Sequence, residues 1–211
     1  ATTEIYTLSL HDALPICINT QLDLDLKSAV RDRSAFLYEC PDCGDKNYID
    51  YGFLYHQMED RIMVQYAQTD EDEQEIRDLF TNDKTGMFQH LKNDNYLIRI
   101  VRSQDELIEK LRLFDNNLDD RIVEIFKFLV FLSFREEAPD FKEITILYFE
   151  EDGKDFVQII ADGKTQGTAE MPRAFYDQLC TDYADYISKT NDDEFVINFK
   201  WAYNVVASKE G

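Results

Sequence analysis

Residues 35–51 read AFLYECPDCGDKNYIDY and carry the most specific motif of the chain. Strands are predicted on both sides of the CPDCG turn, over residues 35–39 and 46–51. The thiols of Cys40 and Cys43 can therefore point at one metal ion, and the glycine that follows permits the backbone conformation of a metal-binding knuckle. Because a β-type sequence follows the turn, the motif favours a zinc-ribbon knuckle over a redox Cys-x-x-Cys that opens a helix, although the redox alternative stays open.

One knuckle is only half of a structural zinc site, since such a site takes four protein ligands. Cys40 and Cys43 are the predicted ligands, and Cys17 and His56 are the candidates for completing the set. His56 has a competing interpretation as a hydrogen-bonded structural residue. Cys180 lies beside an apolar helix face and is interpreted as a core residue.

Hydrophobic periodicity predicts a mixed α+β chain. Strands are expected over residues 18–24, 61–68, 95–101, 144–149, 156–161, 165–171 and 195–197. Helices are expected over residues 25–31, 69–80, 84–92, from a capping box at 103–106 onward, 118–135, 172–189 and after Asn198.

The helix over residues 118–135 is the predicted core of the middle region. Its second half is apolar nearly all round, which is typical of a buried central helix or of an interface helix. The side chains expected to be buried are Ile122, Ile125, Phe126, Leu129 and Leu132. If the helix were largely exposed, its apolar surface would argue for a homodimer.

The composition restricts the partners that we expect. The formal net charge is −21 and the sequence has no run of Lys or Arg, so binding to nucleic acid or to an anionic membrane is not expected. The chain contains four cysteines, too few for a disulfide framework, and no apolar run approaches the ~18 residues of a membrane span. These features predict a cytoplasmic protein with an unidentified protein partner.

The first residues have a foreign composition. Residues 2–16, TTEIYTLSLHDALPI, resemble the translation of a short-read sequencing adapter. We therefore expect residues 1–16 to be non-native and to make few native contacts.

Several stretches resemble the CpXC family, uncharacterised bacterial proteins named for two Cys-Pro-x-Cys motifs. The resemblance rests on residues 18–19, 22–26, 40–44, 54–58, 97–101, 106–110 and 118–121 together with Glu124, while Gln57 replaces the usual Asp. It implies that the first Cys-Pro-x-Cys motif stands upstream of Ile18, where the adapter-like segment now lies. It also implies zinc in the native full-length protein, absent from or weakly held by the present chain.

The sequence thus predicts an α+β protein with an incomplete zinc-ribbon-like β module over residues 17–70. This module is followed by a helical region with one strand over residues 71–137 and by a C-terminal hairpin and helix region over residues 138–211. The leading hypothesis is a non-enzymatic interaction protein with a structural zinc ribbon. The alternative is an enzyme that binds a small molecule in a cleft between the β module and the remainder. No arrangement of side chains predicts a catalytic centre.

Overall fold

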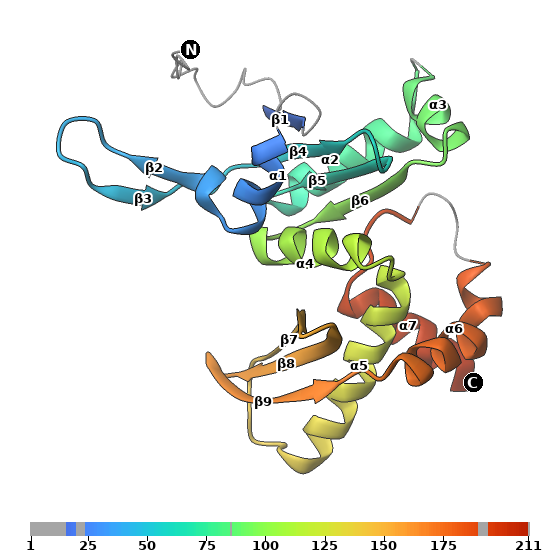
Figure 1. The fold of residues 1–211 in the computed structure, drawn as a ribbon. Helices are drawn as coiled ribbons and strands as arrows, with labels where there is room; N and C mark the ends of the chain where they lie inside the picture. Colours follow the sequence, from blue (N-terminus) through green and yellow to red (C-terminus); the bar gives the residue numbers. More distant parts are fainter. Residues whose placement is uncertain (1–15, 20–23, 85, 190–193, 211) are drawn as a thin grey trace. The chain divides into compact units, whose positions relative to one another are not determined.

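The computed structural model describes residues 16–19, 24–84, 86–189 and 194–210. The chain forms two compact units that divide after Ser103. Both units combine helices with a small β-sheet, so the predicted α+β class is confirmed (Figure 1). The division into segments over residues 17–70, 71–137 and 138–211 stays a prediction. Residues 1–16, which were expected to be non-native, lie outside the described residues except for Ile16.

A four-stranded mixed sheet forms the centre of the first unit. Its order is β1 (Ile16–Asn19), β4 (Phe53–Gln57), β5 (Ile62–Tyr66) and β6 (Leu97–Val101). β4 and β5 are antiparallel, whereas β1 and β6 run parallel to their neighbours. The sequence analysis missed β4, and it extended the first strand too far, because Leu24 already belongs to the next helix.

The described residues of this unit form the α-helices α1 (Leu24–Arg31), α2 (Asp70–Thr81) and α3 (Met87–Asn93). The acidic stretch opens α2 as predicted. The Asp72 N–H donates to the Thr69 hydroxyl over 3.1 Å, and the Thr69 N–H donates to the Asp72 carboxylate over 3.0 Å. This capping box satisfies two backbone groups, and the acidic side chains suit the positive end of the helix dipole.

A separate two-stranded sheet, β2 (Leu37–Glu39) and β3 (Lys46–Tyr48), carries the CPDCG turn. Figure 1 shows this hairpin extending away from the four-stranded sheet of its unit. β2 begins later than predicted because Ser34–Phe36 form a short 3-10 turn (η1) that buries the Phe36 ring.

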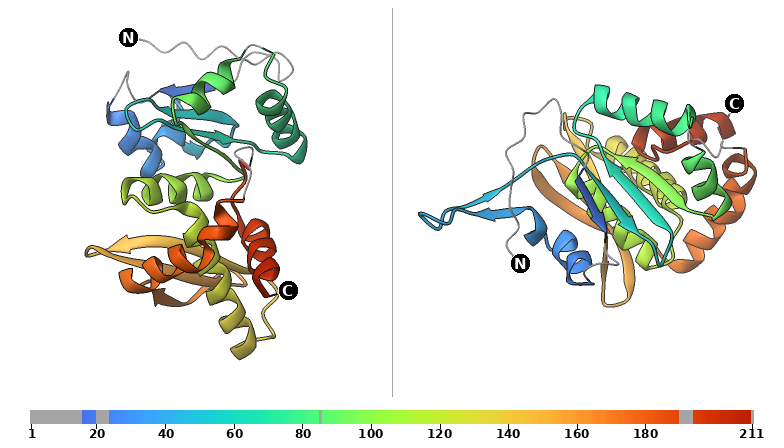
Figure 2. Two further views of the ribbon diagram at one scale, coloured as in Figure 1. Left: turned by 90° about the vertical axis from the view of Figure 1, so that its right-hand side faces the viewer. Right: turned by 90° about the horizontal axis from the view of Figure 1, so that it is seen from above.

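In the second unit, the described residues form α-helices and an antiparallel sheet with the order β7-β8-β9. Its elements are α4 (Gln104–Asp115), α5 (Asp120–Glu137), β7 (Ile144–Glu151), β8 (Lys154–Ala161), β9 (Lys164–Glu170), α6 (Arg173–Ile187) and α7 (Phe199–Glu210). Asp-Gly pairs with positive φ make both hairpin turns. Figure 1 shows α5 between the sheet and helices α6 and α7, and Figure 2 shows the same unit from two further sides; α5 contacts the sheet and both helices.

The burial of side chains on α5 confirms the predicted core helix only in part. Ile122, Ile125 and Phe126 are buried and Leu129 packs against the core, but Leu132 is 39% exposed. Beyond Phe128 no residue of α5 is fully buried, since the last turns of the helix reach past the elements that cover its first half. The expectation for Leu132 was therefore wrong.

In α6, Phe175 is 39% exposed although its ring still contacts Phe126. One expectation near the C-terminus also needs correction, because residues 195–197 form no strand, although Phe195 and Ile197 are both buried. The alternation of buried side chains therefore reflects packing of an extended segment, without a ladder of hydrogen bonds. Among the described helices, none combines the length and apolarity needed to cross a membrane.

Candidate metal centre

The β2–β3 hairpin places Cys40 and Cys43 at its tip. The strands pair in the register Leu37 with Tyr48 and Glu39 with Lys46. Beyond the last pair, the Cys40 N–H donates to the Asp45 carbonyl over 2.8 Å and so closes the turn. The tip is accessible, because Cys43 is exposed and Cys40 is half-buried.

The glycine after the second cysteine is needed for its backbone conformation, since a methyl side chain at this position would not collide with a neighbour. Gly44 has φ +74°, and a Cβ built on it would meet no atom within 4 Å. Its N–H donates to the Cys40 carbonyl over 2.9 Å. Only glycine adopts this left-handed conformation without strain, so the sequence-based argument for this position is confirmed.

The turn also directs hydrogen-bond donors at one sulfur. The backbone N–H groups of Cys43 and Asp42, together with the Cys43 thiol, hydrogen-bond to the Cys40 sulfur and lower its pKa below the ordinary thiol value. Donors that favour the charged form of a ligand also favour metal coordination, since the thiolate is the form that binds the ion. The two sulfur atoms therefore lie close together, as a shared ion would need.

The fit to zinc covers half of the coordination sphere. Cys40 and Cys43 supply the thiolate chemistry of two tetrahedral corners. In the part of the chain that the structure describes, no three or more His, Cys, Asp or Glu side chains gather into a possible metal site. The zinc ribbon, with Cys40 and Cys43 among its ligands, therefore stays a prediction.

The two candidates for completing the set lie on the four-stranded sheet. The His56 ring nitrogen Nε2 is 3.1 Å from the Tyr96 hydroxyl, and burial lowers the pKa of His56 below its usual value. This contact matches the structural interpretation of His56. In β1, Cys17 is in register with Leu54 of β4, but its side chain lies outside the described part of the structure. Their roles as metal ligands stay predictions.

Cys180 is on α6, in the second unit, and is half-buried against the main apolar cluster. Burial raises the pKa of its thiol. The packing of this half-buried side chain against the apolar cluster agrees with its interpretation as a core residue.

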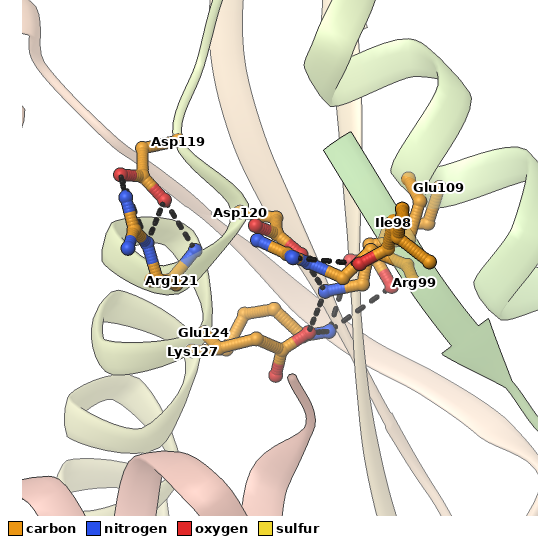
Figure 3. A network of polar contacts seen from close by, with 9 residues as sticks. Ile98, Arg99, Glu109, Asp119, Asp120, Arg121, Glu124 and Lys127 are labelled. Atoms are coloured by element: carbon orange, nitrogen blue, oxygen red, sulfur yellow. Dashed lines mark hydrogen bonds and ion pairs between the residues drawn. The ribbon is translucent and has the colours of Figure 1, made fainter. Parts of the chain in front are cut away.

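The sequence analysis missed a network of buried charges in the second unit (Figure 3). Its members are all less than 9% exposed: Glu109, Lys110, Asp120, Glu124 and Lys127. Lys110 Nζ lies 2.9 Å from an Asp120 oxygen and 3.7 Å from Glu124. Lys127 Nζ lies 2.8 Å from Glu124 and 2.9 Å from Glu109. Glu124 therefore bridges both ammonium groups.

The network joins three elements of the unit. Glu109 and Lys110 come from α4, and the other three side chains from α5, while the Tyr148 N–H of β7 donates to Glu109 over 2.8 Å. Burial works against the charge of Lys127, but the carboxylates of Glu124 and Glu109 outweigh it and raise the lysine pKa. The network sets three carboxylates against two ammonium groups, and Lys110 Nζ lies close to its carboxylates without a well-aligned hydrogen bond. Buried ion pairs of this kind are weak evidence for stability, because the cost of desolvation can exceed the Coulombic gain.

The sequence did contain a signal for this network, which went unused. Lys110, Asp120 and Glu124 are among the residues on which the family resemblance rests. At the start of α5, Asp119 accepts a hydrogen bond from the Arg121 N–H.

Fold and site together define an α+β protein with a Cys-Pro-x-Cys hairpin and a buried charge network. The sequence model of the CpXC protein family matches residues 12–127, more than half of the chain. The chain therefore belongs to the CpXC family. No curated protein and no solved structure matches the chain. The family match includes the Cys40–Cys43 hairpin and ends at Lys127, so it contains all five network residues.

Proposed function

We propose that this CpXC protein is a non-enzymatic interaction protein held by structural zinc, with Cys40 and Cys43 as two of four thiolate ligands. The observation that carries the proposal is the preformed turn: a left-handed Gly44, closed by a hydrogen bond to Cys40, with backbone donors aimed at the sulfur. This is the local structure that a zinc knuckle needs before metal binds.

Exposed apolar side chains support a binding role over catalysis. On the hairpin, Tyr48 is 67% exposed and Ile49 is 41% exposed. In the second unit, Phe199 and Tyr203 of α7 are exposed and contact Phe128 or Phe131 of α5 through their rings. Large exposed aromatic groups that lie together are typical of surfaces that bind other proteins.

The enzyme alternative has weaker support. Catalytic groups with perturbed pKa values usually face a cleft where substrate can reach them. Glu109 and Lys127 have raised pKa values, yet both are buried and paired with each other. Their geometry favours a structural role in joining α4 to α5.

The direct test is zinc content per chain by elemental analysis after removal of loosely bound metal. It compares the present chain with a form that carries a second Cys-Pro-x-Cys motif upstream of Ile18. We expect about one chelator-resistant zinc per chain in the second form and none after Cys40→Ser with Cys43→Ser. Cys180→Ser is the matched control, because that thiol lies in the other unit. No zinc in the form with both motifs would overturn the proposal and favour the redox alternative.

A further inference from the structure

We infer that helix α7 is a self-association surface, on which a second copy of this chain docks antiparallel across a two-fold axis. The inference rests on the interaction role proposed above and names one partner for it, but it does not involve the zinc site. The surface is the exposed stripe of α7, which consists of Phe199, Lys200, Tyr203, Asn204, Ala207 and Ser208.

The first argument is the exposure of large rings on this stripe. Phe199 is 43% exposed and Tyr203 is 54% exposed, and the two lie one turn apart on the same helix. The Phe199 ring contacts Phe128 and Phe131 of α5, and the Tyr203 ring contacts Phe128, so packing holds both rings in place. Covering fixed rings of this kind with another protein removes apolar area from water at little cost in side-chain order.

The second argument is the order of side-chain sizes along the stripe. Phe199, Tyr203 and Ala207 are spaced by four residues and form one ridge on the helix surface. When two copies of α7 pack antiparallel about an axis at Tyr203, each Phe199 ring faces the partner's Ala207, and the two tyrosines meet at the axis. A large side chain then faces a small one on both sides of the axis, so the two ridges can interdigitate.

The third argument is charge. The chain has a net charge of −21, so two copies repel each other wherever their carboxylates face. Residues 195–209 contain Lys200 and Lys209 and no aspartate or glutamate. In the antiparallel pair, Lys200 lies near the partner's Ser208, and the two copies of Lys200 lie at opposite ends of the interface. Two acidic chains can therefore approach closely on this stripe without bringing like charges together.

The experiment measures molar mass by light scattering over a range of chain concentrations, with EDTA present so that metal takes no part. We expect a concentration-dependent rise from the 24.9 kDa of one chain to twice that mass. Added salt should tighten the dimer, because it screens the repulsion between the two acidic chains. A chain that stays monomeric at every concentration, or a dimer that salt weakens, would overturn the inference.

A matched pair of substitutions locates the interface. Phe199→Glu should raise the dimer dissociation constant by at least about 100-fold, because the two-fold axis places the new carboxylate in the interface twice. Phe175→Glu is the control and should leave dimerisation unchanged. Phe175 is 39% exposed and its ring also contacts α5, but it lies on α6. Equal effects of the two substitutions would overturn the assignment to α7.

A swap of side-chain sizes tests the antiparallel register. Ala207→Phe alone should weaken the dimer, because two large side chains then meet on each side of the axis. The double variant with Phe199→Ala should recover dimerisation, since a large side chain again faces a small one. Circular dichroism and the fluorescence of Trp201, the single tryptophan of the chain, check that each variant is folded. A folded double variant that dimerises no better than Ala207→Phe would overturn the register.

The outcomes also separate this inference from the proposed function. A chain that stays monomeric but binds zinc once it carries both Cys-Pro-x-Cys motifs would overturn the α7 dimer and leave the zinc-binding role intact. Cys40→Ser with Cys43→Ser should leave the dimer unchanged, because both thiols lie in the first unit. Loss of the dimer in this folded variant would overturn the α7 surface.

Discussion

Lys127 Nζ lies 2.9 Å from Oε1 and 3.0 Å from Oε2 of Glu109, so one ammonium group of α5 contacts both oxygens of a carboxylate of α4. Both side chains are buried. Removal of either charge leaves the other uncompensated in a medium of low dielectric constant, which costs more than the net value of the pair.

We therefore expect Lys127→Met to lower the free energy of unfolding by about 3–5 kcal/mol. The double variant with Glu109→Gln should recover part of that loss, because glutamine keeps an acceptor for the Tyr148 N–H but carries no charge. Urea denaturation of the four forms gives the coupling energy. The control is Arg173→Met, which breaks the exposed pair with Asp177 and should cost no more than about 1 kcal/mol. Equal losses at the two sites would contradict the network as described.

The apolar surface of α5 gives a second prediction. Ile125→Ala should cost about 2–5 kcal/mol, whereas Leu132→Ala should cost less than about 1 kcal/mol, because only the first leaves a cavity in the core. Ile125 is fully buried and Leu132 is 39% exposed. Comparable losses at both positions would show that the last turns of α5 are covered.

His56 gives a prediction about pH. Burial lowers its pKa below the ordinary 6.5, so the unfolded chain binds this proton more readily than the folded chain. The contribution to stability is present above the unfolded pKa and is lost as pH falls through the folded pKa. NMR titration of the His56 ring should give a pKa below 6.5, and denaturation between about pH 7.5 and about pH 5 should show a shallower pH dependence in His56→Gln.

Two outcomes bear on this prediction. His90→Gln is the matched control and should leave the His56 titration unchanged. A His56 ring that titrates above its ordinary value would contradict the burial of the side chain beside Tyr96.

The knuckle itself is testable at one glycine. Gly44→Ala should weaken zinc binding, because alanine at φ +74° costs about 1 kcal/mol and the turn must hold that conformation to align both thiolates. Gly167→Ala on β9 is the control, since its Cβ also meets no atom within 4 Å and its φ is not in the left-handed region. Competition with a chelator of known affinity measures the difference. Equal zinc affinity of Gly44→Ala and the parent chain would argue against the preformed turn.

Local sequence determined the elements that depend on a few neighbouring residues. The CPDCG turn and the start of the helix at residue 70 appear where they were predicted, because backbone sterics and short-range hydrogen bonds decide them. The core helix was predicted to within two residues at each end for the same reason. Periodicity also identified Cys180 as a core residue.

Only the tertiary structure decided which polar residues are buried and which apolar ones are exposed. Glu109 and Lys110 occupy ordinary helix positions, and nothing local distinguishes them from solvated charges until α5 and β7 bring partners within 3 Å. Leu132 shows the reverse case, since an apolar side chain on a buried helix is covered only where another element reaches it. Tertiary structure also decides which groups could join Cys40 and Cys43 as metal ligands. A turn fixes two sulfur atoms by local geometry, but the other two ligands must come from elsewhere, and local sequence does not encode which distant groups meet in space.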